Sequence, residues 1–263
     1  MHVPRKRFGQ NFLEERAVVA RMLAAIAPQP HERFVEIGPG LGALTDPLLE
    51  RLGHLHVVEI DRDIVARLRG RHGAGKLDVH EGDALAFDFS ALGPDLRVVG
   101  NLPYNISTPL LFHLGAHARA VRDAHFMLQR EVVERMGARP GTPQYGRLSV
   151  MLQYRWEVEP LFDVGPEAFR PAPKVWSSVV RMVPHRVLPH AADDETMLAA
   201  IVGKAFGQRR KTLRNAMREV LSGADFDALG IDPASRGETL DVAQFVRIAN
   251  FAARRIPSPG LPS

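Results

Sequence analysis

The chain has 263 residues, of which 45% are hydrophobic and 24% are charged. This composition is typical of a folded globular protein of one or two domains, and it excludes disordered and collagen-like chains. Cys is absent, which excludes disulfide scaffolds, zinc fingers, iron–sulfur clusters and thiol nucleophiles. The 34 Lys and Arg residues outnumber the 30 Asp and Glu residues, and this small excess favours a polyanionic partner without requiring one.

Neither a secretion signal nor a membrane span is expected from the sequence. The one apolar stretch near the N-terminus, residues 17–27, is interrupted by Arg21, and no run has the length and apolar character of a membrane span. We therefore expect a cytoplasmic protein that does not bind membranes. A coiled-coil pattern and a long apolar face are also absent, so a monomer is expected.

The first half of the chain alternates short apolar runs with longer amphipathic ones, which predicts β-α units and a mostly parallel sheet. Strands are predicted at 33–37, 55–60, 77–80, 96–100 and 124–128, with helices between them at 43–51, 64–71 and 109–118. Residues 148–159 and 174–183 show partial period-2 alternation and predict two strands that add an antiparallel edge. The predicted fold class is α/β, with a doubly wound sheet.

A second domain is predicted after this sheet. Residues 183–190 contain two prolines and little periodicity, so we place a boundary there, between domains at 1–184 and 185–263. The second domain is predicted to be all-α, with helices at 197–206, 212–221, 226–229 and 242–253.

A ligand site is predicted where the first strands end. Gly38, Gly40 and Gly42 follow the first strand directly, and glycine allows close approach of a ligand to free N–H groups at a helix start. Glu59 ends the second strand, where an acid would bind ribose hydroxyls. Asp83 follows the third strand and would accept a hydrogen bond from an adenine amino group or form a turn. These features fit both NAD and S-adenosylmethionine.

An unusual turn follows the fourth predicted strand, with the sequence Asn101, Leu102, Pro103, Tyr104. Pro103 stiffens the backbone, and the turn presents an amide and an aromatic side chain. An Asx turn with a packed Tyr is the simpler interpretation. The turn also resembles the N/D-P-P-Y-type motif of amino-methylating enzymes, in the N-L-P-Y form of the rRNA adenine dimethyltransferases. With it, the whole chain resembles the KsgA/RsmA family, the dimethyladenosine transferases that act on the 3′ end of small-subunit rRNA.

The resemblance extends over nearly the full length. Further matching motifs follow in order at residues 5–13, 36–42, 58–63, 82–85, 129–132, 145–149, 169–175 and 206–214. The chain departs from the family pattern at Ala172, Trp176 and Gly237, none of which is assigned to the chemistry.

The resemblance implies a Rossmann-like class I methyltransferase domain, a helical rRNA-binding domain and S-adenosylmethionine as cofactor. The implied enzyme dimethylates N6 of two adjacent adenines in the 3′-terminal hairpin loop of 16S rRNA, within a pre-ribosomal particle, as part of ribosome biogenesis. The predicted cofactor contacts are Asn11, Leu13, Gly38, Gly40, Glu59, Asp83 and Asn101. Of these, Asn11 and Leu13 are implied by the resemblance alone.

The predicted catalytic residues are Asn101, Leu102, Pro103, Tyr104 and Phe169. The adenine amino nitrogen is a weak nucleophile because its lone pair is delocalised into the ring. Hydrogen bonds from this amino group to the Asn101 side-chain oxygen and a nearby backbone carbonyl would aim the lone pair at the methyl group without a strong base. Tyr104 would stack on the extruded base, and by resemblance Phe169 would close the other face, although its apolar character fits an ordinary core residue as well.

Two basic clusters are predicted to contact rRNA phosphates. Their members are Arg5, Lys6 and Arg7, and then Lys204, Arg209, Arg210, Lys211, Arg214 and Arg218. No acid occurs between the first and last residues of the second cluster, which favours phosphate binding over a merely solvated helix face.

Other functions remain open from the sequence. An NAD-dependent oxidoreductase would share the glycine loop but leaves Asn101 and Tyr104 without a role. A large-subunit rRNA adenine dimethyltransferase of the macrolide-resistance type shares the chemistry, and a ribosome-assembly binding factor could share the fold. His113 and His117 are four residues apart on a predicted helix without a Glu-containing zinc motif, so no metal site is expected.

Overall fold

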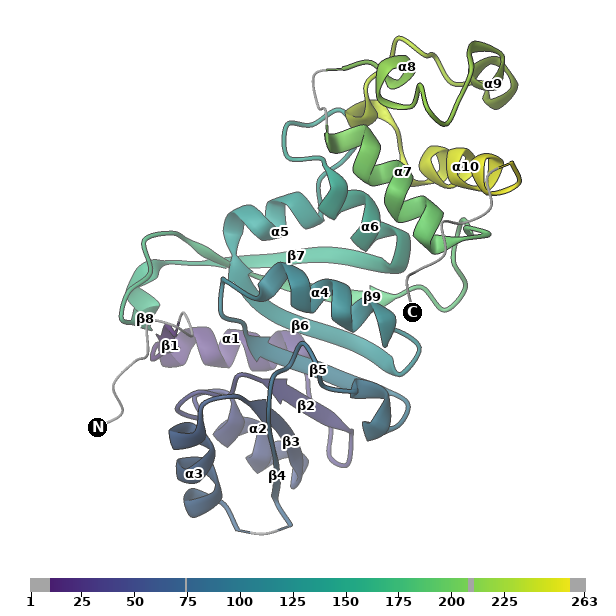
Figure 1. The fold of residues 1–263 in the computed structure, drawn as a ribbon. Helices are drawn as coiled ribbons and strands as arrows, with labels where there is room; N and C mark the ends of the chain where they lie inside the picture. Colours follow the sequence, from purple (N-terminus) through teal and green to yellow (C-terminus); the bar gives the residue numbers. More distant parts are fainter. Residues whose placement is uncertain (1–9, 74, 208–210, 256–263) are drawn as a thin grey trace. The chain divides into compact units, whose positions relative to one another are not determined.

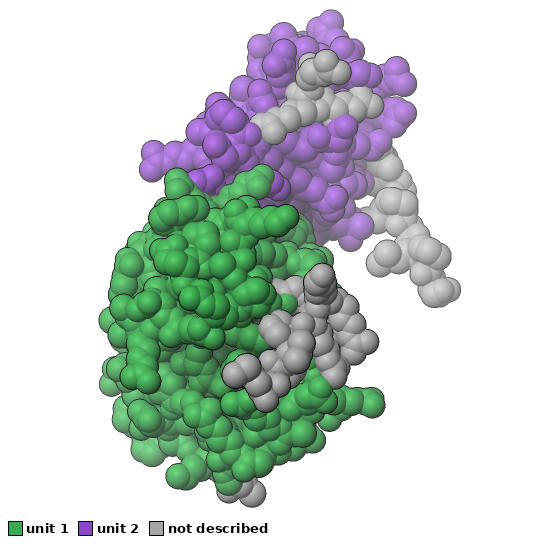
Figure 2. All heavy atoms as spheres, turned by 90° about the vertical axis from the view of Figure 1, so that its left-hand side faces the viewer, with its two compact units in different colours: residues 1–133, 156–184 green, residues 134–155, 185–263 purple. Residues whose placement is uncertain are grey.

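The computed structural model describes residues 10–73, 75–207 and 211–255. The chain forms two compact units, shown in different colours in Figure 2. Unit 1 comprises residues 1–133 and 156–184, and unit 2 comprises residues 134–155 and 185–263. Among the described residues, no helix has the length and apolar character needed to cross a membrane.

Unit 1 is built on a seven-stranded sheet with the order β4-β3-β2-β5-β6-β9-β7 (Figure 1). The strands are β2 (Phe34–Ile37), β3 (Leu55–Glu59), β4 (Leu77–Glu81), β5 (Leu96–Asn101), β6 (Val121–Gln129), β7 (Trp156–Val164) and β9 (Ser177–Pro184). Strands β2 to β6 pair in parallel, and β9 is antiparallel to both β6 and β7. The predicted parallel sheet with an antiparallel edge is confirmed. Its order reverses between β2 and β5, which is where open α/β sheets bind ligands.

Helices cover the sheet of unit 1 on its two faces. They are α1 (Arg16–Ile26), α2 (Thr45–Leu52), α3 (Arg62–Arg71) and α4 (Ser107–Ala116), with short 3₁₀ turns η2 (Phe89–Leu92) and η3 (Pro166–Ala168). Buried residues of α1, α2 and α3 share one core with apolar residues of β2, β3 and β4, whereas α4 lies over the other face in Figure 1. A separate two-stranded sheet pairs β1 (Phe12–Leu13) with β8 (Phe169–Arg170).

The ends of these helices follow local chemistry. Helix α3 begins after Asp61, whose carboxylate accepts a hydrogen bond from the Asp63 N–H at 3.1 Å. Helix α2 ends at Gly53, where φ is 78°, a left-handed conformation that glycine adopts without strain.

Unit 2 is helical and contains the last turn of α5 (Arg130–Met136 as a whole) and all of α6 (Arg147–Arg155) from the earlier chain segment. The later segment supplies α7 (Glu195–Gly207), α8 (Leu213–Ala216), α9 (Gly223–Leu229), the 3₁₀ turn η4 (Gly237–Thr239) and α10 (Val242–Ala253). Leu198, Ile201, Phe245 and Ile248 are fully or almost fully buried in its core. A Cβ at Gly237 would lie 2.9 Å from the Ala205 Cβ, so this departure from the family pattern accompanies tight packing of η4 on α7.

The strand predicted at 148–159 is wrong over its first part, because residues up to Arg155 form helix α6. Val150, Leu152 and Tyr154 are buried, and this spacing of two residues imitates a strand. Val150 and Tyr154 are also four residues apart, so they lie on one helical face, and both belong to the core of unit 2. Residues 134–155 belong to unit 2, where the buried face of α6 packs. The boundary predicted from the sequence, after residue 184, assigns them to the first domain.

Candidate active site

A cavity of about 280 Å³ in unit 1 lies at the carboxyl ends of β2, β3, β4 and β5. Its walls are the N-terminal segment 10–13, the loop after β2, the ends of β3 and β4, and the turn after β5. The residues predicted to contact a cofactor all line it: Asn11, Leu13, Gly38, Gly40, Glu59, Asp83 and Asn101. The structure therefore brings these residues together around a single cavity.

The loop after β2 requires glycine at three positions. Gly38, Gly40 and Gly42 have φ values of 66°, 53° and 93°, which other residues adopt only with strain. A Cβ at Gly40 would lie 3.0 Å from a ring carbon of Phe12, and one at Gly38 would lie 3.8 Å from Pro103. The loop is thus packed closely between the N-terminal segment and the Asn-Leu-Pro-Tyr turn, and its backbone forms part of the cavity wall.

Two buried carboxyl groups stand beside this loop. Glu59 accepts a hydrogen bond from the Asp61 N–H at 2.8 Å, and burial raises the pKa of its carboxyl. Glu36 accepts a hydrogen bond of 2.6 Å from the Thr45 hydroxyl, and burial raises the pKa of Glu36 to about 8, with the charges of Asp46 and Glu59 acting in the same direction. Glu36 was not predicted to have a role in the site. Because a nearby positive charge stabilises the ionised form of a buried acid, Glu36 favours a cationic group at the cavity.

Asp83 is exposed at the edge of the cavity. One of its carboxylate oxygens accepts a hydrogen bond from the Leu85 N–H at 2.9 Å, so the residue forms the turn that its spacing allowed. This bond uses one oxygen and fixes the carboxylate beside the cavity. The turn role and a ligand-binding role are therefore compatible in the same side chain.

Asn101 is oriented by the N-terminal segment. Its Nδ2 donates a hydrogen bond to the backbone carbonyl of Asn11 at 3.0 Å. Because a carbonyl oxygen only accepts hydrogen bonds, the amide nitrogen must face Asn11. The Asn101 Oδ1 atom is then the group left to accept a hydrogen bond from a ligand.

Tyr104 is held at both its hydroxyl and its backbone. Its hydroxyl lies 2.7 Å from the Oγ of Ser177, and the Ser107 hydroxyl donates to its carbonyl oxygen at 3.0 Å. Burial raises the pKa of Tyr104, so the phenol stays protonated at neutral pH and acts as a hydrogen-bonding group. Ser177 was not identified from the sequence because its partner lies 73 residues away in the chain.

The N-terminal segment is attached to unit 1 at several points. Strand β1 pairs with β8, with Leu13 opposite Phe169. The Gln10 side chain donates to the Asp61 carboxylate at 3.2 Å. These contacts hold Asn11 and Leu13 at the cavity, where the resemblance placed them.

Phe169 departs from its expected position. Its side chain is fully buried in the hydrophobic core that includes Leu13 and Val179, and it does not line the cavity. The structure shows this ring as a residue of the core, and its stacking on a base stays a prediction. A buried Phe and a pocket Phe have the same apolar signature in sequence, so only the tertiary packing distinguishes them.

The basic residues of unit 2 are only partly described. Lys204, Lys211 and Arg214 are exposed. A surface hollow of about 240 Å³ is lined by residues that include Lys204, Lys211, Arg218 and Glu219. Glu219 pairs with Lys204 at 2.9 Å, so the hollow is not purely basic. The other expected RNA contacts lie outside the described residues: Arg5, Lys6, Arg7, Arg209 and Arg210.

A doubly wound sheet, a glycine loop at its switch point and an Asn-Leu-Pro-Tyr turn beside one cavity define a Rossmann-like class I methyltransferase. Residues 1–254 match the family model described as ribosomal RNA adenine dimethylase. The chain belongs to this family, which confirms the resemblance found in the sequence. A protein of Aromatoleum aromaticum named ribosomal RNA small subunit methyltransferase A is 64% identical to this chain over 256 residues, or 97% of each chain.

Solved structures share the fold at lower sequence identity. A dimethyladenosine transferase from Plasmodium falciparum has a TM-score of 0.74 and 24% identity, covering 90% of this chain and 95% of its own. The 23S rRNA methyltransferase ErmE has a TM-score of 0.70 and 23% identity, covering 92% and 99%. At this level of identity the two structures support the fold alone.

Proposed function

We propose that the protein dimethylates N6 of two adjacent adenines in the 3′-terminal hairpin loop of small-subunit rRNA, with S-adenosylmethionine as methyl donor. We expect it to act as a monomer in the cytoplasm, on a pre-ribosomal particle. The observation that carries the proposal is the orientation of Asn101, whose Nδ2 is bound to the Asn11 carbonyl so that its Oδ1 is left for an adenine amino group.

The cavity residues fit S-adenosylmethionine better than NAD. The buried Glu36 favours the positive charge that a sulfonium compound carries, whereas its ionised form would oppose a pyrophosphate at the glycine loop. Glu59 ends β3, where an acid binds ribose hydroxyls. Asp83 lines the same cavity, and we propose that its carboxylate accepts a hydrogen bond from the cofactor's adenine amino group. When bound, the cofactor supplies an activated methyl group together with its own leaving group.

The chain's part in the reaction is to position the target amine. The Asn101 Oδ1 accepts one N–H of the adenine, and a backbone carbonyl of residues 101–103 accepts the other. This arrangement favours a tetrahedral nitrogen whose lone pair points toward the methyl donor. Such alignment can be worth about 7–11 kcal/mol in an oriented reaction. A methylated amino cation loses its proton readily, so a strong base is not needed.

Tyr104 provides the surface on which the target base stacks. Extruding a base costs a few kcal/mol, and one aromatic stack returns about 1–3 kcal/mol. The contacts of Tyr104 with Ser177 and Ser107 fix the ring before the base arrives, which reduces the entropy lost on binding.

The choice of small-subunit rRNA is supported by the relative from Aromatoleum aromaticum, whose name specifies the small subunit and which aligns with 97% of this chain. The exposed cations Lys211 and Arg214 of unit 2 are proposed phosphate contacts. Such contacts position an RNA without reading its sequence.

The decisive experiment transfers labelled methyl from S-adenosylmethionine to unmethylated small-subunit particles, with large-subunit rRNA as a parallel substrate. After nucleoside digestion, we expect the label in N6,N6-dimethyladenosine from the small-subunit RNA only. Label on large-subunit RNA alone would replace the proposed substrate, and label on neither RNA would overturn the proposed activity.

A further inference from the structure

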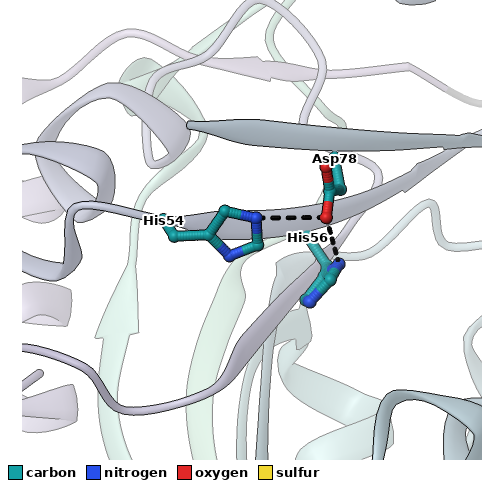
Figure 3. Close-up of side chains that lie close together, drawn as sticks. All are labelled: His54, His56 and Asp78. Carbon is teal, nitrogen blue, oxygen red and sulfur yellow. Dashed lines mark hydrogen bonds and ion pairs between the residues drawn. The ribbon is translucent and has the colours of Figure 1, made fainter. Parts of the chain in front are cut away.

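Two histidines and an aspartate lie together at the amino-terminal ends of β3 and β4, away from the cavity. His54 precedes β3, His56 lies on β3 and Asp78 lies on β4, with the two rings turned toward the Asp78 carboxylate (Figure 3). The His54 Nε2 is 3.1 Å and the His56 Nδ1 is 3.4 Å from the same oxygen of Asp78. One ligand atom from each of the three residues lies within 4.8 Å of the other two.

Strand pairing explains how the sequence builds this cluster. The parallel register of β3 and β4 places His56 opposite Asp78. Alternation along a strand puts His54 and His56 on one face, while Leu55 and Val57 point into the core on the other. The partners come from segments more than 20 residues apart, so the cluster has no short sequence motif. The sequence-based expectation of no metal site rested on His113 and His117, the pair of histidines that share one predicted helix.

The two distances from the imidazoles to the Asp78 oxygen match those of ligands around one metal ion. Zn–N and Zn–O bonds of about 2.0–2.2 Å in a tetrahedron place neighbouring ligand atoms roughly 3.4 Å apart. The two contacts to the Asp78 oxygen, 3.1 and 3.4 Å, are close to this value. The imidazole ligand atoms lie within 4.8 Å of each other, so the two rings need to move together by no more than about 1.4 Å to hold one ion.

The cluster is also accessible. The side chains of His54 and Asp78 are 43% and 49% exposed, and that of His56 is 18% exposed. In the sheet of unit 1, β4 is an edge strand, and no other strand of the described residues pairs with its outer side. The positive charge of Arg33 acts on His56 and opposes a cation there. The Arg33 guanidinium donates a hydrogen bond to the Pro94 carbonyl at 3.0 Å.

We propose that His54, His56 and Asp78 form a binding site for a divalent transition metal, with Zn²⁺ as the preferred ion. Two imidazoles and one carboxylate are a donor set that zinc accepts readily, with one position left open. That position would take water or His80, whose Nε2 lies 3.2 Å from the His56 Nδ1. A bound ion ties the edge strand β4 to β3. This site is independent of the proposed methyl transfer.

The test uses the full-length chain without a purification tag, titrated with Zn²⁺ by calorimetry and with Co²⁺ by visible absorption. We expect one ion per chain with micromolar or tighter affinity. His54→Ala and Asp78→Asn should each weaken binding at least about tenfold, because loss of even an outer partner of a metal site costs about 10–100-fold. His113→Ala is the matched control, since its imidazole lies beside that of His117 but outside the cluster, and it should bind as the native chain does.

Thermal unfolding provides a second measurement. Relative to the Tm of each protein in a chelator, Zn²⁺ should raise the Tm of the native chain and of His113→Ala, and should raise it less in Asp78→Asn. Native-like Zn²⁺ affinity in both His54→Ala and Asp78→Asn would overturn the proposal. So would the absence of stoichiometric binding, or an equal loss of binding in the His113→Ala control.

Discussion

The two units differ in where they keep their polar groups. In unit 1 the described residues include buried acids at Glu36, Glu59, Asp61 and Asp123, together with the buried Arg97. In the described part of unit 2, Ser149 and Asp225 are the buried polar or charged residues, and the cations predicted to bind RNA are exposed.

This difference is what the two proposed kinds of recognition require. Buried acids bind a small cationic ligand strongly, because the local dielectric constant is low. They are also held in position before the ligand arrives, so little reorganisation is needed. RNA phosphates are bound mainly through the release of counterions, which requires cations that are exposed to solvent. This difference agrees with the proposal that unit 1 carries the reaction site and that unit 2 binds the RNA.

The largest effect that would test this comparison is expected at Asn101. Asn101→Ala should lower the rate of methyl transfer by about 10²–10³, as removal of one preorganised hydrogen-bonding group does in other enzymes. Single-turnover transfer and cofactor affinity should be measured together, and the affinity should change much less than the rate. Asn101→Asp retains an acceptor but loses the bond to the Asn11 carbonyl, so we expect an intermediate rate. An unchanged rate in Asn101→Ala would contradict the assigned role.

The next largest effect is expected in unit 2. Replacing both Lys211 and Arg214 with Ala should weaken rRNA binding about 20-fold near physiological salt and reduce the salt slope by about 2, since each phosphate contact contributes about 0.7–0.9 to that slope. Cofactor affinity should not change. Arg247→Ala removes another exposed cation of the same unit and serves as the control. Equal weakening by the control would mean that binding depends on net charge and not on this surface.

A smaller effect, specific to unit 1, concerns pH. Free Glu36 has a pKa of about 8, and a cationic cofactor favours its ionised form, so the complex binds fewer protons than the free protein. The affinity for S-adenosylmethionine should therefore rise with pH, by up to about tenfold between pH 6 and pH 7. Calorimetry or fluorescence titration across this range measures it, with Glu36→Gln as the variant whose affinity stays flat. A flat profile in the native chain would show that Glu36 does not sense the cofactor.

Sequence reasoning recovered the parts of the molecule that depend on local patterns. The strands of the sheet and the glycine loop were predicted because burial in a parallel sheet and positive φ each restrict residue type strongly. It failed at α6, where Val150 and Tyr154 satisfy both a strand and a helix period, and only the core of unit 2 decides between them.

The predicted cofactor contacts line one cavity, and their roles stay predictions. Asn101 and Tyr104 lie in one short motif, whereas Ser177, the partner of Tyr104, lies 73 residues away in the chain and was not identified. The cluster of His54, His56 and Asp78 also depends on strand register, which no single segment encodes. The burial that places Phe169 in the core is likewise a property of the assembled fold.

The chain order of these elements sets an order of folding during synthesis. Strand β9 is inserted between β6 and β7, so neither strand obtains this partner until residues 177–184 have been made. The core of unit 2 contains residues of both α6 and α10, so it forms only after α10 has been synthesised. Helix α10 begins roughly 100 residues after α6, and synthesis of this stretch takes about 5–20 s at usual rates of translation. During that interval the apolar face of α6 is not yet packed in a core. We therefore expect nascent chains that contain α6 but lack α10 to depend most on chaperones.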